Sequence, residues 1–531
     1  MFDGHDHAGR ADVVVEGDRI VAVGPDLPHR GRVVDLDGGL LSPGFVDAHV
    51  HAVQGGLERV RCDLAPVPED AHAYLEAVAA YAHARPDVPW ILGGGWSMAV
   101  FPGGTPTAAE LDHAVPDRPA FLPNRDHHGA WVNTAALERA GIDRHTPDPP
   151  DGRIERDAQG DPTGTLHEGA MRLVTPLLPR TLDEDYDAAL AEGQRYLLSL
   201  GVTGWQDAIV GAYAGMDDPG PIYARAAHRG ALTAYVVGAL WWERDRGLEQ
   251  LAELRRRREE LTQGRFRATS VKVMQDGIAE NGTAAMLEPY LDRCGHPTSN
   301  RGHSFLDAAV LARAVAALDA DGFQVHVHAI GDRGVREALD AFEALPPRSA
   351  GADLRHHLAH LQVVHPDDVP RFARTGVAAN LQTLWACHEP EMDELTVPYL
   401  GERRSRRQYP FGDLHRADAR LAAGSDWPVS TPDPLLAIHT AVNRTTYGAQ
   451  GRAGTDPFLP EQALDLVTAF AAYTSGSAWI NHRDDAGVVR PGAVADLVVL
   501  DRDPFAGPVE DIGATRVVST WVDGVLVAGR A

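Results

Sequence analysis

The sequence predicts an α/β protein: a (β/α)₈ TIM-like barrel, a small β-sandwich domain composed of both chain ends, and an insertion after the first barrel strand. Three observations predict this fold. Apolar segments that resemble strands alternate with amphipathic helical segments through the middle of the 531-residue chain, as in successive βα units. There are eight such strands, the number that closes this kind of barrel. Short alternating segments at both ends indicate one further, smaller sheet.

The two chain ends have the pattern of short strands joined by tight turns. Residues 11–24 (ADVVVEGDRIVAVG) read as two strands around the turn EGD. Residues 495–505 form another strand-like segment, and residues 515–530 read as a hairpin with the turn DG. We therefore expect residues 1–44 and 485–531 to form one β-sandwich domain, with the barrel domain between them at residues 45–484.

The barrel strands are expected at eight apolar segments of the middle region. These segments begin at Gly44, Gly201, Leu232, Thr269, Phe323, Leu354, Gly376 and Arg420. Amphipathic helical segments such as residues 307–322 lie between several of them. The first connection is anomalous, because roughly 140 residues separate the first strand from the second, far more than one crossover helix needs. We expect an inserted subdomain at about residues 55–195 that covers one side of the barrel mouth.

Composition excludes several classes of partner. The formal net charge is −26, so nucleic acid is not expected as a partner. The N-terminus lacks the apolar region of a signal peptide, and no apolar run is long enough to span a bilayer. We therefore expect a cytoplasmic protein without a membrane partner. The widely spaced Cys62, Cys294 and Cys387 are typical of a reducing compartment and not of a disulfide framework or a cysteine metal site.

One short segment, TSVKVMQDG, contains an unusual residue. Lys272 is the only lysine among 49 basic residues. Arginine stays protonated at any ordinary pH, whereas a buried lysine amine can lose its proton and act as a nucleophile. Taken alone, this observation leaves two interpretations open. Either the chemistry of the site requires a lysine, or one lysine remains by chance in a chain that otherwise uses arginine.

Two histidine pairs lie at the ends of predicted strands. His49 and His51, in DAHVHA, are two residues apart and therefore project from the same face of a strand. They lie at the C-terminal end of the first strand, where barrel active sites are built, and imidazole is a common zinc ligand. In the second pair, QVHVHAIGD, His328 is nearer the strand end and is the expected ligand. We expect His326 to be packed or hydrogen-bonded deeper in the barrel.

Two more strands end in residues that can bind metal. The sixth strand ends in His360; we expect His356 to share its face and His357 to face away. The eighth strand ends in GSDWP, which places Asp426 at the mouth. These positions give Lys272, on the fourth strand, a chemical explanation. A neutral lysine amine adds carbon dioxide and becomes a carbamate, an anionic ligand that can bridge two metal ions, and burial favours the neutral amine.

Longer segments resemble the amidohydrolase superfamily, and in particular its YtcJ-like branch (amidohydrolase family 3), which includes N-substituted formamide deformylase. The segments that carry the resemblance extend over essentially the whole chain: LLSPGFVDAHVHA, GGGWSMAVFPGGTPTAAELD, NRDHHGAWVNTAALERAGI, GVTGWQDA, VKVMQDG, HVHAIGDRG, GSDWPVSTPDPLLAIHTAV and RPGAVADLVVLDRDPF. The resemblance implies the composite β-domain. It also implies metal ligands at His49, His51, carboxylated Lys272, His328, His360 and Asp426, with Asp426 also acting as proton acceptor.

Two positions depart from the pattern of that branch. Relatives usually carry a glutamate directly before the sixth-strand histidine, where this chain has Ala359. In RDHHGAW, His127 stands where a glycine is common. Both positions lie near the expected pocket, so the substrate class cannot simply be carried over from the relatives.

The leading functional prediction is a metal-dependent hydrolase of a non-peptide C–N bond in a small-molecule amide, such as an N-formyl or N-acyl amine. One or two divalent ions, with zinc the best match to the ligands, lower the pKa of bound water and supply hydroxide. Asp426 accepts the water proton and passes it to the leaving nitrogen. His128 donates a hydrogen bond to the carbonyl oxygen. Trp96, Trp131 and Trp427 either wall an apolar substrate pocket or pack in the core.

Other reactions and another class of protein remain as alternatives. The same site could open a lactone or cyclic amide, deaminate or decarboxylate. Deamination is disfavoured, because the deaminase branch has a glutamate just after the fifth-strand histidine and this chain offers only Asp332 nearby. A barrel that only binds a ligand predicts a broken set of metal ligands, whereas every position is present here. The resemblance leaves a homodimer open.

Overall fold

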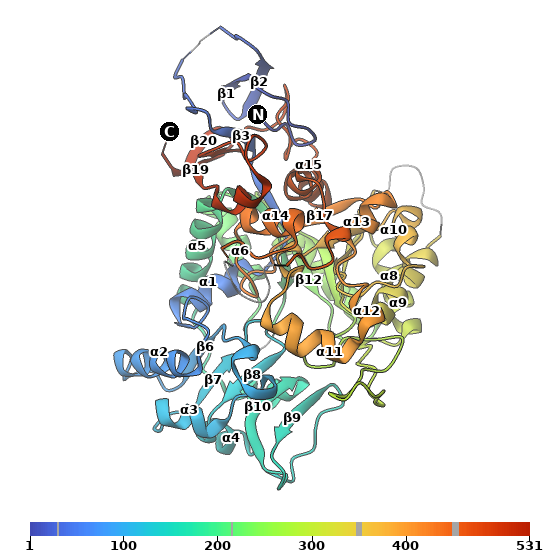
Figure 1. Cartoon of the computed structure of the whole chain (residues 1–531). Coiled ribbons are helices and arrows are strands. Elements are labelled where there is room, and N and C mark those ends of the chain that lie inside the picture. The colour runs from blue at the N-terminus through green and yellow to red at the C-terminus, as the bar shows by residue number, and fades with distance from the viewer. Residues whose placement is uncertain (29–30, 214–215, 347–352, 449–455, 531) are drawn as a thin grey trace.

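An eight-stranded parallel sheet forms the centre of the molecule (Figure 1). The computed structural model describes residues 1–28, 31–213, 216–346, 353–448 and 456–530. The strands pair in chain order and are β4 (Phe45–Val50), β11 (Val202–Val210), β12 (Tyr235–Trp241), β13 (Phe266–Met274), β14 (Gln324–Ala329), β15 (His357–His360), β16 (Ala378–Leu381) and β17 (Leu421–Ala423). The two edge strands meet where the Asp426 N–H donates to the His49 carbonyl at 2.7 Å. The predicted (β/α)₈ barrel is confirmed.

Helices connect successive strands and cover the outside of the barrel. They are α6 (Gly220–His228), α7 (Leu251–Leu261), α8 (Ala308–Ala320), α9 (Asp332–Glu343), α10 (Val369–Thr375), α11 (Val397–Leu400), α12 (Glu402–Ser405), α13 (Phe411–Arg416), α14 (Pro434–Asn443), α15 (Leu466–Ala471) and α16 (Ser477–Ile480). The longer helices turn apolar residues toward the sheet, and the amphipathic pattern is strongest in α9. In α9, for example, Val335, Ala338, Leu339 and Phe342 are buried.

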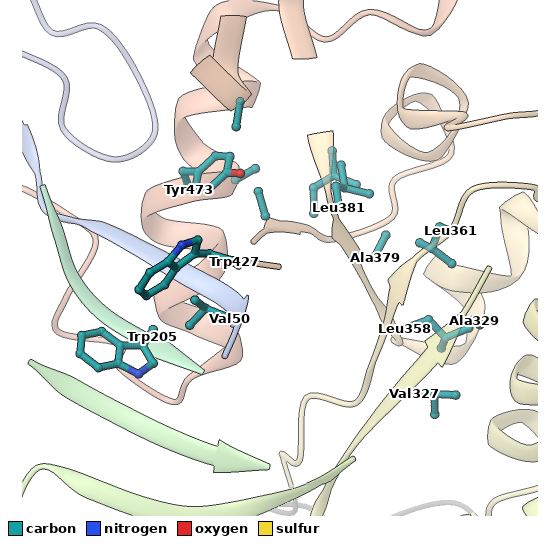
Figure 2. Close-up of a cluster of buried hydrophobic side chains, with 14 of the residues drawn as sticks. Val50, Trp205, Val327, Ala329, Leu358, Leu361, Ala379, Leu381, Trp427 and Tyr473 are labelled. Atoms are coloured by element: carbon teal, nitrogen blue, oxygen red, sulfur yellow. The ribbon is translucent and has the colours of Figure 1, made fainter. Parts of the chain in front are cut away.

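The main hydrophobic core lies between the barrel strands and these helices. Alternate residues of a barrel strand face the interior and the helix layer. Val327 on β14 pairs with Leu358 on β15, and both belong to this core. Figure 2 shows these two side chains near each other, with Trp205 and Trp427 in another part of the same cluster. His326 and His328, which flank Val327 on β14, therefore face the barrel interior.

The long first connection forms a second sheet beside the barrel. Its strands pair in the order β5 (Cys62–Asp63), β6 (Ile91–Gly94), β7 (Ala120–Pro123), β8 (Gly129–Val132), β10 (Pro162–Glu168) and β9 (Gly152–Arg156). Its helices are α2 (Ala71–Ala84), α3 (Ala108–Ala114) and α4 (Thr134–Ala140). The chain leaves the barrel through α1 (Ala52–Val60) and returns through α5 (Asp183–Ser199). These two helices touch at Gly56, where a Cβ would lie 1.9 Å from the Ala189 carbonyl oxygen.

Both chain ends contribute to a small antiparallel sheet on the other side of the barrel (Figure 1). Its strands are β20 (Val525–Gly529), β19 (Val517–Val522), β18 (Leu497–Leu500) and β3 (Leu40–Pro43), in this order. A hairpin of β1 (Asp12–Glu16) and β2 (Arg19–Gly24) precedes β3. Because β3 pairs with β18, the composite nature expected for this sheet is observed.

The three cysteines are free thiols. Burial raises the pKa of the Cys62 and Cys387 thiols to about 12, so both are unreactive at neutral pH. Among the described residues, none of the helices combines the length and the apolar character that crossing a bilayer requires.

Candidate active site

The first-strand histidines meet the eighth-strand carboxylate at the C-terminal end of the barrel. His51 Nε2 lies 2.9 Å from Asp426 Oδ1, and His49 Nε2 lies 3.3 Å from the same oxygen. Asp426 has a φ of 57°, a left-handed conformation that aspartate tolerates better than most residues. Its backbone N–H is bonded to the His49 carbonyl, which fixes the carboxylate against the histidine pair.

His360 completes a buried set of three groups that could hold a metal ion, which we call the metal-binding cluster. Ligand atoms of His49, His360 and Asp426 all lie within 4.8 Å of one another. Strict alternation along β15 would point His360 to the same side as Leu358, toward the helices. His360 instead has a φ of 79°, which ends the pleat and turns the imidazole toward the barrel axis.

The neighbouring histidines of β15 lie opposite to the sequence prediction. His357 faces the barrel interior, where its ring is 4.2 Å from that of His326. His356 faces the helix layer, where its Nε2 contacts Asp319 on α8 at 2.9 Å. The prediction was wrong because it counted faces from His360, whose positive φ breaks the alternation.

The fifth-strand histidines differ in their partners. His328 Nδ1 lies 3.2 Å from Asp276 Oδ1, and its ring is 4.4 Å from that of His360. A carboxylate partner of this kind orients a metal-binding histidine and fixes its tautomer. His326 lies deeper and is hydrogen-bonded to Gln206 and His49, at 2.7 and 2.9 Å, as expected from the sequence.

Lys272 lies at the same cluster. Its Nζ is 3.2 Å from His49 Nε2, and the side chain is only 3% exposed. Burial lowers the pKa of the amine to about 7, although Asp426 and Asp207 act in the opposite direction. A substantial fraction of the amine is therefore neutral near neutral pH, the form that can react with carbon dioxide.

The donor groups fit a divalent metal ion. Burial, followed by repulsion from Lys272, lowers the pKa of His49 to about 3, and burial also lowers that of His328, so both rings are neutral. Although burial opposes it, His49 keeps the pKa of Asp426 well below its ordinary value. Within the described residues, the buried Nδ1 atoms of His51 and His360 have no hydrogen-bond partner. Neutral imidazoles beside one carboxylate form the set that binds zinc-like ions.

A second ion pair adjoins the metal-binding cluster. His128 Nδ1 lies 2.8 Å from Glu168 Oε1, and the His128 ring is 5.8 Å from that of His328. Burial alone would lower the pKa of His128, but the Glu168 carboxylate raises it to about 9. His128 is therefore an imidazolium at neutral pH and can donate a hydrogen bond toward the barrel mouth.

A cavity of about 470 Å³ lies between the barrel mouth and the inserted sheet. Trp96 and Trp427 line it, together with Trp385, which stacks on the His360 ring with centroids 5.4 Å apart. Trp131 does not line this cavity. It packs 6.1 Å behind Trp96, and its indole N–H donates to the Thr107 carbonyl at 2.7 Å. Of the three tryptophans expected at a pocket, two are placed there and Trp131 belongs to the core of the insert.

Several polar residues of the site were missed in the sequence. Glu168 ends β10 and Asp276 follows β13, whereas Gln206 and Asp207 lie in the middle of β11. Asp276 accepts hydrogen bonds from the backbone N–H groups of Ala285, Ile330 and Gly331, so it also anchors the loops around His328. The only feature of the sequence that could have indicated them was the short run of polar residues in segments such as WQDA and MQDG. Such runs also occur in ordinary loops.

The fold and the cluster together define a class: a metal-dependent hydrolase built on a parallel eight-stranded barrel. The profile of the Amidohydrolase family matches residues 32–528, and the chain belongs to this family. It is 30% identical to the YtcJ protein of Bacillus subtilis (strain 168) over 93% of this chain and 90% of that one. It is 29% identical to N-substituted formamide deformylase of Arthrobacter pascens, over 97% and 94% of the two chains.

A solved structure supports the same assignment. An uncharacterized metal-dependent hydrolase from Pyrococcus horikoshii OT3 superposes with a TM-score of 0.71 at 26% identity, and the match covers 94% of each chain. The protein is therefore an enzyme, a hydrolase that acts on carbon–nitrogen bonds. The resemblance stated from the sequence is confirmed at the level of the family.

Proposed function

We propose that this enzyme hydrolyses a non-peptide amide bond of a small molecule, with N-formyl and N-acyl amines as its substrate class. The observation that carries the proposal is the meeting of His49, His360 and Asp426 within 4.8 Å below a cavity of about 470 Å³. The cavity has the size of a small-molecule site. The likeness to an N-substituted formamide deformylase supports the choice of bond.

Zinc is the proposed ion, because imidazole and carboxylate ligands suit it. His49, His51, His328, His360 and Asp426 would hold it, and a carbamate on Lys272 would add an anionic ligand able to bridge a second ion. When bound, a divalent ion polarises the scissile carbonyl and makes hydroxide available near neutral pH.

The protein side chains then move and stabilise the charges of the reaction. Asp426, ionised and in contact with His49 and His51, accepts the proton of the attacking water and delivers it to the leaving nitrogen. His128, held as an imidazolium by Glu168, donates to the carbonyl oxygen as negative charge develops there. Trp427 and Trp96, on the cavity wall, limit the access of bulk water.

The test is Asp426→Asn assayed on a matched amide and ester. Loss of a general base costs a factor of about 10² to 10⁴ in rate, so kcat for the amide should fall by that amount while metal content is retained. The loss on the ester should be smaller, because an alkoxide leaves more easily than an amine anion. Asp418→Asn is the matched control, since Asp418 is exposed and has the same φ of 57°. A wild type that prefers the ester, together with an unimpaired Asp426→Asn, contradicts amide hydrolysis.

A further inference from the structure

The cavity over the metal-binding cluster has a strongly acidic lining. Six carboxylates line it, from Glu58, Asp63, Asp126, Glu280, Glu389 and Glu391, against the two guanidinium groups of Arg59 and Arg125. Both arginines already have carboxylate partners outside the lining. Arg125 is bonded to Glu69 at 2.6 Å, and Arg59 to Glu192 at 2.9 Å. Among the described residues, neither arginine forms an ion pair with a carboxylate of the lining.

Three of these carboxylates form one wall, which we call the acidic wall: Glu280, Glu389 and Glu391. Glu280 follows β13, and the other two follow β16. Burial, followed by repulsion from Glu391, raises the pKa of Glu389 to about 8. Burial raises that of Glu280 as well. These carboxylates repel one another when ionised, and a cation placed among them would relieve that repulsion.

A neighbouring buried amide also points to a ligand that donates hydrogen bonds. Gln362 lines the cavity and is only 1% exposed. Its Nε2 donates to Gln408 Oε1 at 3.1 Å and approaches Glu280 Oε1 at 3.5 Å. Among the described residues, no donor is bonded to Gln362 Oε1, so this oxygen can accept a hydrogen bond from an N–H group of a molecule bound in the cavity.

Aromatic rings complete the surroundings of the acidic wall. Trp96, Trp385 and Trp427 line the same cavity, and aromatic faces attract alkylammonium and guanidinium groups. Trp385 also stacks on His360 of the metal-binding cluster. A molecule in the cavity can therefore reach the reacting centre with one end and the acidic wall with the other.

We infer that the substrate is an N-acyl or N-formyl amine that carries a second, cationic group, an alkylammonium or guanidinium, which binds at the acidic wall and at Gln362. This inference rests on the proposed function and names its substrate class. Hydrolysis breaks the amide C–N bond, transfers the oxygen of water to the acyl carbon and a proton to the nitrogen, and releases a carboxylate and a diamine. The cationic end takes no part in the chemistry and determines which amides bind.

The experiment compares N-formyl-1,5-diaminopentane, which is cationic, with N-formylhexylamine, which is neutral and of similar length. The cationic substrate should have the higher kcat/KM. Glu389→Gln and Glu391→Gln should each raise its KM by about 10- to 100-fold, the loss expected for a hydrogen bond to a charged group, and should affect the neutral substrate less. Glu394→Gln is the control, because Glu394 is exposed on the same segment, Glu391–Thr396, and should behave as wild type.

Equal or better turnover of the neutral substrate by the wild type, with no selective effect in either variant, overturns the inference and leaves the proposed function standing. If neither amide is hydrolysed, the proposed function fails. Titration calorimetry with 1,5-diaminopentane then tests separately whether the acidic wall binds a cation. Binding of the diamine by the wild type that is weakened in Glu389→Gln supports a cation site at the acidic wall. Absence of binding by the wild type refutes this site.

Discussion

Lys272 shows how one residue type can be required by its chemistry. The side chain is buried beside His49, and its amine pKa is lowered to about 7. An arginine at this position would stay charged among metal-binding histidines and could not form a carbamate. Lys272 is the only lysine among 49 lysine and arginine residues, and the proposed carbamate gives a chemical reason for it.

Lys272→Ala and Lys272→Arg should both abolish most of the activity. Removing even a hydrogen-bond partner of a metal ligand typically costs about 10- to 100-fold, so kcat/KM should fall by more than ~100-fold. Added short carboxylates should partly restore Lys272→Ala, because they can replace the carbamate, and should not restore Lys272→Arg. Elemental analysis should show less metal per chain in both variants.

Arg267→Lys provides the matched control, since Arg267 is exposed on the same strand, β13, and should leave activity unchanged. Labelling with ¹³C-bicarbonate offers a direct readout of the modification. A carbamate resonance in the wild type that is absent in Lys272→Arg supports the proposal. Its absence from active, metal-loaded wild type would show that the lone lysine serves another purpose.

At the scale of elements, strand pairing in the insert creates a buried ion pair. His128 immediately precedes β8 and Glu168 ends β10. The two strands pair antiparallel with Gly129 opposite His167, so the Glu168 N–H donates to the His128 carbonyl at 3.0 Å. The two side chains then meet above the barrel. Formation of the His128–Glu168 pair therefore requires the insert to be folded, and it places His128 of the insert beside the barrel site.

Glu168→Gln should destabilise the protein in a pH-dependent manner. The pKa of His128 is raised from 6.5 to about 9, so its stabilising contribution is complete below pH 6.5 and is lost as pH rises through 9. The pKa of Glu168 is lowered from 4.5 to about 2, so its contribution is present above pH 4.5 and is lost as pH falls through 2.

The free energy of unfolding of Glu168→Gln should thus be lower than that of wild type by about 3–5 kcal/mol near pH 6, with the difference shrinking above pH 9. Denaturant unfolding at a series of pH values measures it. Glu138→Gln, an exposed residue of α4 in the same insert, should show no such dependence. A constant difference from pH 6 to 10 would indicate a packing effect and not a charge pair.

At the scale of the whole molecule, closure of the barrel brings the residues of the candidate site together. His49 and Asp426 are far apart in sequence, and they meet only because the first and last strands close the barrel. An ion bound by residues of β4, β14 and β15 and of the segment after β17 would therefore link distant parts of the fold. Such a ligand stabilises the native state relative to the unfolded chain.

Removal of metal should lower the melting temperature of the enzyme as well as its activity. An ion present at a thousandfold excess over its Kd adds about 4 kcal/mol to the stability of the native state. Scanning calorimetry of chelator-treated and zinc-reloaded protein, at one scan rate, compares the two states. Asp426→Ala should show a smaller shift on reloading, because it lacks one ligand. Equal melting temperatures together with full activity after chelation would contradict a metal-dependent site.

Local sequence patterns were sufficient to place the eight barrel strands and to nominate most of the site. Apolar runs and their alternation with helices depend on periodicity, which is a property of neighbouring residues. His49 and His51 share a face for the same reason. Lys272, His328, His360 and Asp426 could be grouped because the C-terminal ends of all strands meet at one rim of a barrel.

The sequence by itself therefore determined the barrel, the composite terminal sheet and the residues nominated for a metal site, and only the tertiary structure decided how these residues are arranged. The inward turn of His360 depends on a φ of 79°, which no periodicity predicts. Glu168 contacts His128 across a strand pair, and Glu280, Glu389 and Glu391 line the same cavity although they come from two separate loops. These contacts arise from loop closure between distant segments, whose free energy depends on packing over the whole molecule and leaves no signal in neighbouring residues.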